Sequence, residues 1–331
     1  MAGIHVSGGT YSGSGDVTTD WVRIEGSSVF IAPDGTLTLT LDTDDPSTGQ
    51  RALYNAGTFT NNNGTVYVNV STSAANYAKL DARGSPYYNV IIKNDGTDTN
   101  RVQMDNAAAT ILNDLTIEQG SLETYNTSGR HLTVSGNVEI QDGGTVNMNN
   151  TSANDGNFGS LHMLAGGTYN ATSGTTTINY KNGLYSVIYR NSGIMIHNSG
   201  TLKLNTNTDA VFGGGGGTGG PWNVIATERG AGTYTYRVYA TPIIENDLTI
   251  SGNVIYNNNL AGGTNHTVSG NVLVTTSGSY ANTGANVNTH TFGSLTIETA
   301  STFIAPTSGT TTITGEVDDY AFYAKGGSNF T

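Results

Sequence analysis

Two short acidic runs are the residues of this sequence best suited to chemistry. Asp42-Thr43-Asp44-Asp45 and Glu316-Val317-Asp318-Asp319 each place carboxylates within a few residues of one another. Paired carboxylates can perform the acid–base steps of glycan cleavage, and clustered carboxylate oxygens can hold a cation such as Ca²⁺. Neither run matches the EF-hand loop or the glycine- and aspartate-rich nonapeptide repeat. We interpret both runs as solvated loop charge, and we expect no catalytic residue, no cofactor and no metal site.

A glycine-rich run is the next candidate. Residues 213–220 read GGGGGTGG, but the Lys-Ser or Lys-Thr pair that completes a phosphate-binding loop is missing. The run lies within residues 209–241, which we expect to form an inserted loop at the side of the fold. Aromatic side chains in such a loop can stack on sugars, anchor partner chains or cover the protein's own flank. The aromatic residues that we single out as a possible contact surface are Trp222, Tyr234, Tyr236 and Tyr239.

Two of the 6 histidines, His131 and His266, lie next to the same phrase in two parts of the chain. A duplicated position indicates a structural role, because a catalytic site is normally built once. We predict that both histidines are satisfied within the fold and that neither is catalytic.

The composition narrows the classes of partner. The net charge is −12, and the 13 basic residues are scattered along the sequence, which argues against nucleic-acid binding. No apolar run approaches the roughly 20 residues that a membrane helix needs. The absence of cysteine rules out a disulfide framework. The first residues, MAGIHVSGGTYSGSG, lack the basic and apolar regions of a signal peptide, so we expect assembly in the cytoplasm or a leader that has been removed.

The elements that must position these residues are short β-strands. Charged residues make up only 11% of the chain, against a usual share of about a quarter, and glycine is abundant at 45 residues. Such a chain could be disordered, but triplets such as LTI, LTV and LKL recur and are each followed closely by Gly, Asn or Ser. Alternation bounded by turn residues is typical of strands, and no stretch has a helical period. We predict an all-β fold.

The strands belong to a long repeat. Matching segments lie 133 or 134 residues apart, and the phrase at 25–33 returns at 298–306, two periods later. We therefore divide the chain into three units, at 1–110, 111–243 and 244–331, of which the last is incomplete. The matching segments are 113–117 with 246–250 (NDLTI), 134–138 with 268–272 (VSGNV), and 158–161 with 292–295 (FGSL).

A shorter rhythm within each unit predicts the architecture. Strand-like triplets begin 14 to 18 residues apart, at Leu115, Leu132, Val146, Leu161 and Thr176. One triplet cannot bury its own apolar face, whereas stacked turns share a continuous core and align their polar turn residues into ladders. The pattern resembles right-handed parallel β-helix proteins over nearly the whole chain, with turns of roughly 15 to 22 residues. A sandwich array is the alternative, although the expected NG and DG hairpin pairs are few.

This resemblance implies a structural function. A cysteine-free acidic β-solenoid without an export signal resembles the tail fibres, tailspikes and capsid decoration proteins of tailed bacteriophages. We expect a virion component that serves rigid display and attachment. Its partners would be copies of itself, with a trimer favoured or head-to-tail stacking at the open last coil, other virion proteins, and a cell-surface glycan. Two alternatives remain open: an extracellular adhesin or filament-forming solenoid, and a polysaccharide lyase or depolymerase on the same scaffold.

Overall fold

The chain folds entirely into parallel β-strands within the residues that the structure describes. The computed structural model describes residues 3–41, 50–70, 77–94, 101–105, 108–124, 129–149, 154–179, 186–214, 216–240, 243–258, 265–283, 288–315 and 320–331. Every regular element in these ranges is a strand, and the strands stack in parallel as a β-solenoid. The all-β class and the parallel β-helix architecture are thus confirmed.

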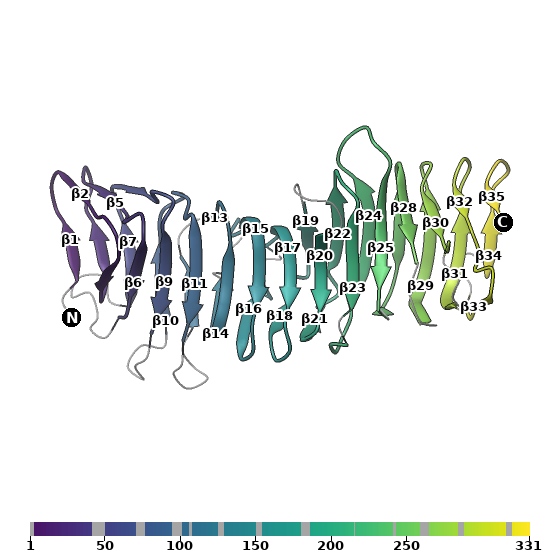
Figure 1. Cartoon of the computed structure of the whole chain (residues 1–331), viewed down its shortest axis with the longest axis horizontal. Coiled ribbons are helices and arrows are strands. Elements are labelled where there is room, and N and C mark those ends of the chain that lie inside the picture. Colours follow the sequence, from purple (N-terminus) through teal and green to yellow (C-terminus); the bar gives the residue numbers. More distant parts are fainter. Residues whose placement is uncertain are drawn as a thin grey trace. The chain divides into compact units, whose positions relative to one another are not determined.

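Two compact units make up the fold. The first unit contains residues 1–158 and 163–172, and the second contains residues 159–162 and 173–331. One strand, β17 (Gly156–Met163), contributes residues to both. Within each unit the strands run side by side from turn to turn (Figure 1). The described residues include no helix long and apolar enough to cross a bilayer.

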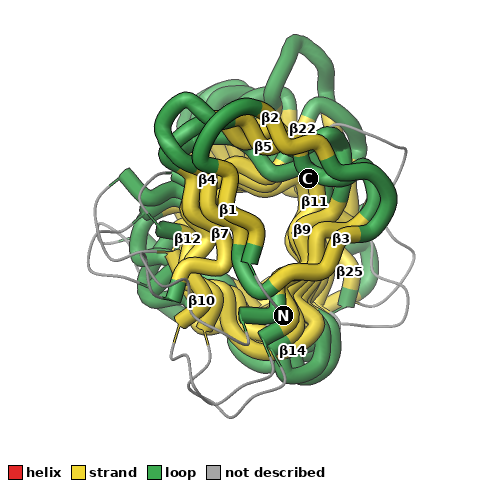
Figure 2. The backbone as a smooth tube through the Cα atoms, turned by 90° about the vertical axis from the view of Figure 1, so that its left-hand side faces the viewer, coloured by secondary structure: helices red, strands yellow, loops and turns green. Residues whose placement is uncertain are grey.

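The coil of the first unit is right-handed. From the N-terminal side, the chain passes clockwise from β1 (Ile4–Val6) through β2 (Thr10–Ser12) to β3 (Val17–Thr19) as it recedes (Figure 2). Parallel crossovers are right-handed in nearly all proteins because of the strand twist. The resemblance to right-handed β-helices therefore holds for the hand as well.

Three strands make one turn, so the expected turn length of roughly 15 to 22 residues is wrong. Leu115 pairs with Val138, 23 residues later, and Leu122 pairs with Val146, 24 residues later. The triplets that suggested a shorter turn lie two strands apart, because every second strand was recognised. Leu115, Leu132 and Val146 accordingly fall on three different faces of the first unit.

The first unit has three faces, each a ladder of parallel strands. One face contains β1, β4 (Val22–Ile24), β7 (Arg51–Asn55), β10 (Tyr77–Asp81), β12 (Arg101–Met104), the end of β14 (Leu115–Thr124), β16 (Gly144–Asn147) and β18 (Thr168–Asn170). The second contains β2, β5 (Val29–Ile31), β8 (Thr58–Thr60), β13 (Ala109–Ile111) and the start of β15 (Leu132–Ile140). The third contains β3, β6 (Thr36–Leu39), β9 (Thr65–Asn69), β11 (Asn89–Lys93), the start of β14 and the end of β15.

The second unit repeats this arrangement. One face contains β20 (Ser186–Asn191), β23 (Ala210–Gly214), β25 (Tyr234–Tyr239), β28 (Val254–Asn257), β30 (Ser279–Ala281), β32 (Thr302–Phe303) and β35 (Asn329–Phe330). Another contains β21 (Ile194–Ile196), β26 (Ile243–Ile244), the starts of β29 (Asn265–Thr275) and β31 (Asn288–Ile297), and β33 (Gly309–Ile313). The third contains β19 (Thr175–Ile178), β22 (Thr201–Thr206), β24 (Asn223–Glu228), β27 (Leu248–Ser251), the ends of β29 and β31, and β34 (Phe322–Ala324).

Apolar side chains at alternate strand positions form continuous rows through the core. Val66, Val90, Leu115 and Val138 occupy the same position in four successive turns of the first unit, and all four are buried. Full burial of a Val or Leu side chain is worth about 1.5–3 kcal/mol. One strand cannot form such a row alone, so the core depends on turns resting on turns.

The repeated phrases build the corners between faces. Asp114 Oδ1 accepts a hydrogen bond from the backbone N–H of Asn137 in the next turn, at 2.8 Å, and Asp247 accepts one from Asn271 at the same distance. The residue before each asparagine is a glycine, where a Cβ atom would lie only 2.3 Å from the aspartate oxygen. The NDLTI and VSGNV phrases therefore encode one corner, made once in each unit.

Asparagine side chains stack at the same corners. In the first unit the Nδ2 of Asn113 donates to Oδ1 of Asn89, one turn earlier, at 2.9 Å. In the second unit Asn246 donates to Asn223 in the same way, also at 2.9 Å. The predicted ladders of polar turn residues are thus present at these positions. Each ladder satisfies amide groups that would otherwise compete with the strand hydrogen bonds.

The two histidines are not equivalent, contrary to the sequence prediction. When Val134 is aligned with Val268, the counterpart of His266 is Leu132 rather than His131. Both Leu132 and His266 are fully buried, so a histidine takes a core position in the second unit. His131 is half-buried at a turn, where its Nδ1 accepts the backbone N–H of Asp155 at 2.9 Å.

A polar and aromatic cluster surrounds the buried histidines of the second unit. His266 pairs with His290 in the next turn, and its Nδ1 lies 3.0 Å from the Tyr280 hydroxyl. The amide nitrogens of Asn258 and Asn282 lie 2.9 and 3.1 Å from Nε2 of His290. Burial lowers the pKa of His266 to about 3 and that of His290 to about 4. Both imidazoles are therefore neutral in the folded protein at neutral pH.

Candidate functional site

The acidic runs cannot be assessed, because residues 42–45 and 316–319 lie outside the described residues. Elsewhere in the described ranges, no three His, Asp or Glu side chains come close enough together to hold a metal ion. The site with the clearest geometry instead lies in the glycine-rich part of the second unit.

Residues 209–241 do not form an inserted loop. This stretch contains β23, β24 and β25, which pair in parallel register with strands of the turns before and after. The expectation was wrong because the segment departs from the long repeat while keeping the strand alternation, as in Tyr234-Thr235-Tyr236-Arg237-Val238-Tyr239. Part of the glycine run, Gly213 and Gly214, closes β23, and residues 216–220 connect this strand to the next face.

The four aromatic residues of this stretch have different environments. Tyr236 is fully buried and its hydroxyl donates to the Thr227 carbonyl oxygen at 2.6 Å, so it cannot belong to a contact surface. Burial raises the pKa of Tyr236 to about 12. Tyr234 is partly exposed, and Tyr239 is 51% exposed. Trp222 is partly exposed and stacks on the His197 ring, with ring centres 4.9 Å apart.

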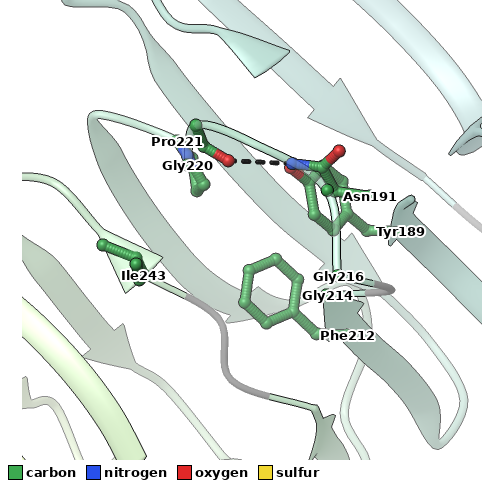
Figure 3. Close-up of a pocket in the computed structure, with 10 residues that line it drawn as sticks. Tyr189, Asn191, Phe212, Gly214, Gly216, Gly220, Pro221 and Ile243 are labelled. Atoms are coloured by element: carbon green, nitrogen blue, oxygen red, sulfur yellow. Dashed lines mark hydrogen bonds between the residues drawn. The ribbon is translucent and has the colours of Figure 1, made fainter. Parts of the chain in front are cut away.

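A small cavity opens beside the glycine run. It has a volume of about 130 Å³. Phe212 and Tyr189 form its deep wall with stacked rings 5.0 Å apart, and Ile243 and Pro221 line it further out (Figure 3). The remaining lining residues are Asn191, Gly214, Gly216, Gly217, Gly219 and Gly220.

Register explains why the cavity exists. Ile194 pairs with Thr218 of the next turn, so the buried Met195 is followed across the ladder by Gly219. Gly219 adds no side chain to the core, and a Cβ atom there would lie 2.1 Å from the Met195 carbonyl oxygen. Its φ of 71° also disfavours other residues. The stack therefore leaves one core position unfilled, at a cost on the order of 3 kcal/mol for a cavity of this size.

Polar groups fix the loop around the cavity. The Asn191 side chain crosses to the loop, where its Nδ2 donates to the Gly219 carbonyl oxygen at 2.8 Å (Figure 3). On the outer side, the backbone N–H of Gly220 donates to Glu245 Oε1 at 3.0 Å, and Glu245 lies 3.2 Å from His197 Nε2. These contacts hold the loop in one conformation, so the cavity is a fixed feature of the turn.

Basic residues are less scattered in space than in sequence. The guanidinium carbons of Arg23, Arg51 and Arg83 lie 5.7, 5.2 and 5.3 Å from the centre of the Tyr54 ring in the first unit. Each of these arginines also lies near a carboxylate, at 2.6 Å in the case of Arg23 and Glu25. The cluster is balanced in charge, so it is better suited to bracing the surface than to binding a polyanion.

These features can bind and stack, and the described residues of the cavity contain no paired acid and base. Sequence reasoning missed the cavity because its signal, a glycine opposite a buried methionine, depends on the register between turns. The glycine run itself was visible but was interpreted as a loop. No protein-family model, curated protein or solved structure matches this chain.

Proposed function

We propose that this chain is a structural β-solenoid component of a bacteriophage virion that serves rigid display and attachment. The observation that carries the proposal is the use to which the repeated phrases are put. In both units the aspartate and asparagine of these phrases bond to the next or the preceding turn. Residues that recur along the chain are thus devoted to stacking, as a scaffold requires.

The composition supports a virion component over a polyanion-binding protein. The chain is acidic, contains no cysteine, and has its best-defined arginine cluster neutralised by carboxylates. The proposed partners are other copies of this chain, with a trimer favoured, other virion proteins, and a cell-surface glycan. The proposed location is the virion, after assembly in the host cytoplasm.

Solution mass and electron microscopy of the purified protein test this proposal. We expect particles of fixed size with three times the chain mass of 34.4 kDa. Filaments that lengthen with protein concentration would contradict it and favour the filament-forming adhesin. Release of oligosaccharides from acidic polysaccharides would contradict a purely structural role and favour the depolymerase. Monomers without either property would overturn the proposed assembly.

A further inference from the structure

The cavity beside Gly219 differs from the rest of the second unit's core. In neighbouring turns of the same face, the buried positions are filled by Met195, Ile244 and Val268. The turn between Met195 and Ile244 contributes Gly219, whose backbone lies too close to Met195 to carry a side chain. The vacancy therefore cannot be closed by a local rotamer change, and the bonded loop around it prevents collapse.

The walls of the cavity favour an apolar guest. Phe212 and Tyr189 present stacked rings, and the Phe212 ring lies 6.3 Å from that of Tyr256 in a later turn. Aromatic pairs with ring centres 4.5–7 Å apart attract one another beyond simple burial of area. The side chains of Ile243 and Pro221 add apolar surface, and no charged side chain lines the cavity. A sugar ring would leave most of its hydroxyl groups without partners here.

The size of the cavity sets the size of the guest. An engineered apolar cavity of about 150 Å³ in another protein stays dry and binds benzene. The cavity of this chain, at about 130 Å³, is comparable, and it opens at Ile243, which is 53% exposed. We infer that this cavity binds a single aromatic ring of benzene size, entering past Ile243 to lie against Phe212 and Tyr189. This inference does not depend on the proposed virion function.

Fluorine NMR of fluorobenzene with the full chain tests the inference. We expect saturable binding with a dissociation constant on the order of 1 mM or tighter. Ile243→Phe places a ring at the mouth that competes for the cavity, so fluorobenzene binding should weaken by at least tenfold. Ile196→Phe is the matched control, since Ile196 is 44% exposed and does not line the cavity; binding should be unchanged. Circular dichroism checks that both variants fold.

Competition identifies the source of the ring. Displacement of fluorobenzene by N-acetylphenylalaninamide would indicate an aromatic side chain of a partner protein, whereas displacement by toluene alone would indicate a free small molecule. Absence of saturable fluorobenzene binding would overturn the inference. Equal binding to the wild type and to Ile243→Phe would overturn it as well, and so would equally effective displacement by galactose.

Discussion

The core of the first unit and the last turns of the second unit solve the same packing problem with different residues. In the first unit, Phe30 and Phe59 stack at 6.2 Å among rows of Val, Leu and Ile. In the second unit, Tyr280 stacks on Phe303 at 5.0 Å and bonds to the buried His266. The difference teaches that a stacked core tolerates polar residues when turns supply their partners, and that it then becomes sensitive to the loss of any partner.

The largest expected effect comes from removing the centre of the polar cluster. Tyr280→Ala should lower the free energy of unfolding of the second unit by about 5 kcal/mol, since it removes a buried ring and leaves the His266 Nδ1 without its partner. Phe59→Ala in the first unit removes a ring alone, at about 3–5 kcal/mol. Urea unfolding followed by hydrogen exchange measures both losses. A smaller loss for Tyr280→Ala than for Phe59→Ala would break the comparison.

Acid should distinguish the two cores next. The folded pKa of His266, about 3, lies below its ordinary value of 6.5, so the unfolded chain binds more protons between these values. Stability is therefore full above pH 6.5 and is lost as the pH falls towards 3. Because a pKa difference of one corresponds to about 1.4 kcal/mol, His266 alone costs on the order of 4 kcal/mol.

Hydrogen exchange at pH 7.5, 5.5 and 4 resolves this prediction by region. Protection in β29 and β31 should fall first, while β9 and β11 keep theirs, since the described residues of the first unit include no fully buried histidine. His266→Leu supplies the residue found at the matching position of the first unit, and it should reduce the acid sensitivity. Parallel loss of protection in both units would show that the histidines are not responsible.

The corner aspartates should have smaller and equal effects. Asp114→Ala and Asp247→Ala each remove a charged acceptor from a backbone N–H, which is worth about 1.5–3 kcal/mol. Thermal unfolding and exchange at the N–H groups of Asn137 and Asn271 report the loss. Asp34→Ala, at an exposed turn, is the control. If the two corner variants differed by more than about 1 kcal/mol, the corners would not be equivalent.

The smallest effect concerns the surface of the first unit. Tyr54→Leu should cost about 1 kcal/mol, because three guanidinium groups lose their contact with the ring. Tyr54→Phe keeps the ring and should retain most of the stability. Urea unfolding of both variants decides the matter. Equal losses would mean that the hydroxyl bond to Arg83, at 3.2 Å, matters rather than the ring.

The sequence was sufficient for the fold class but not for the turn or the cavity. Alternating triplets bounded by Gly and Asn predict short stacked strands, because few other structures bury such isolated apolar residues. The turn length was missed because strands on the three faces look alike, so Leu115 and Leu132 could be placed on one face. The cavity could not be foreseen, since Gly219 has meaning only once it is set against Met195. The position of His266 was misread by one residue, which exchanged a core position for a turn.

Removing one whole turn tests the central claim most directly. Deletion of residues 115–137 joins Asp114 to Val138, which is the in-register partner of Leu115, so every later strand keeps its face. The account predicts a folded protein with a cooperative unfolding transition and wild-type strand content. Deletion of residues 115–131, which matches the spacing of the triplets and puts Leu132 in place of Leu115, should shift the faces and prevent stacking. If the shorter deletion folded and the whole-turn deletion did not, the three-strand turn would be contradicted.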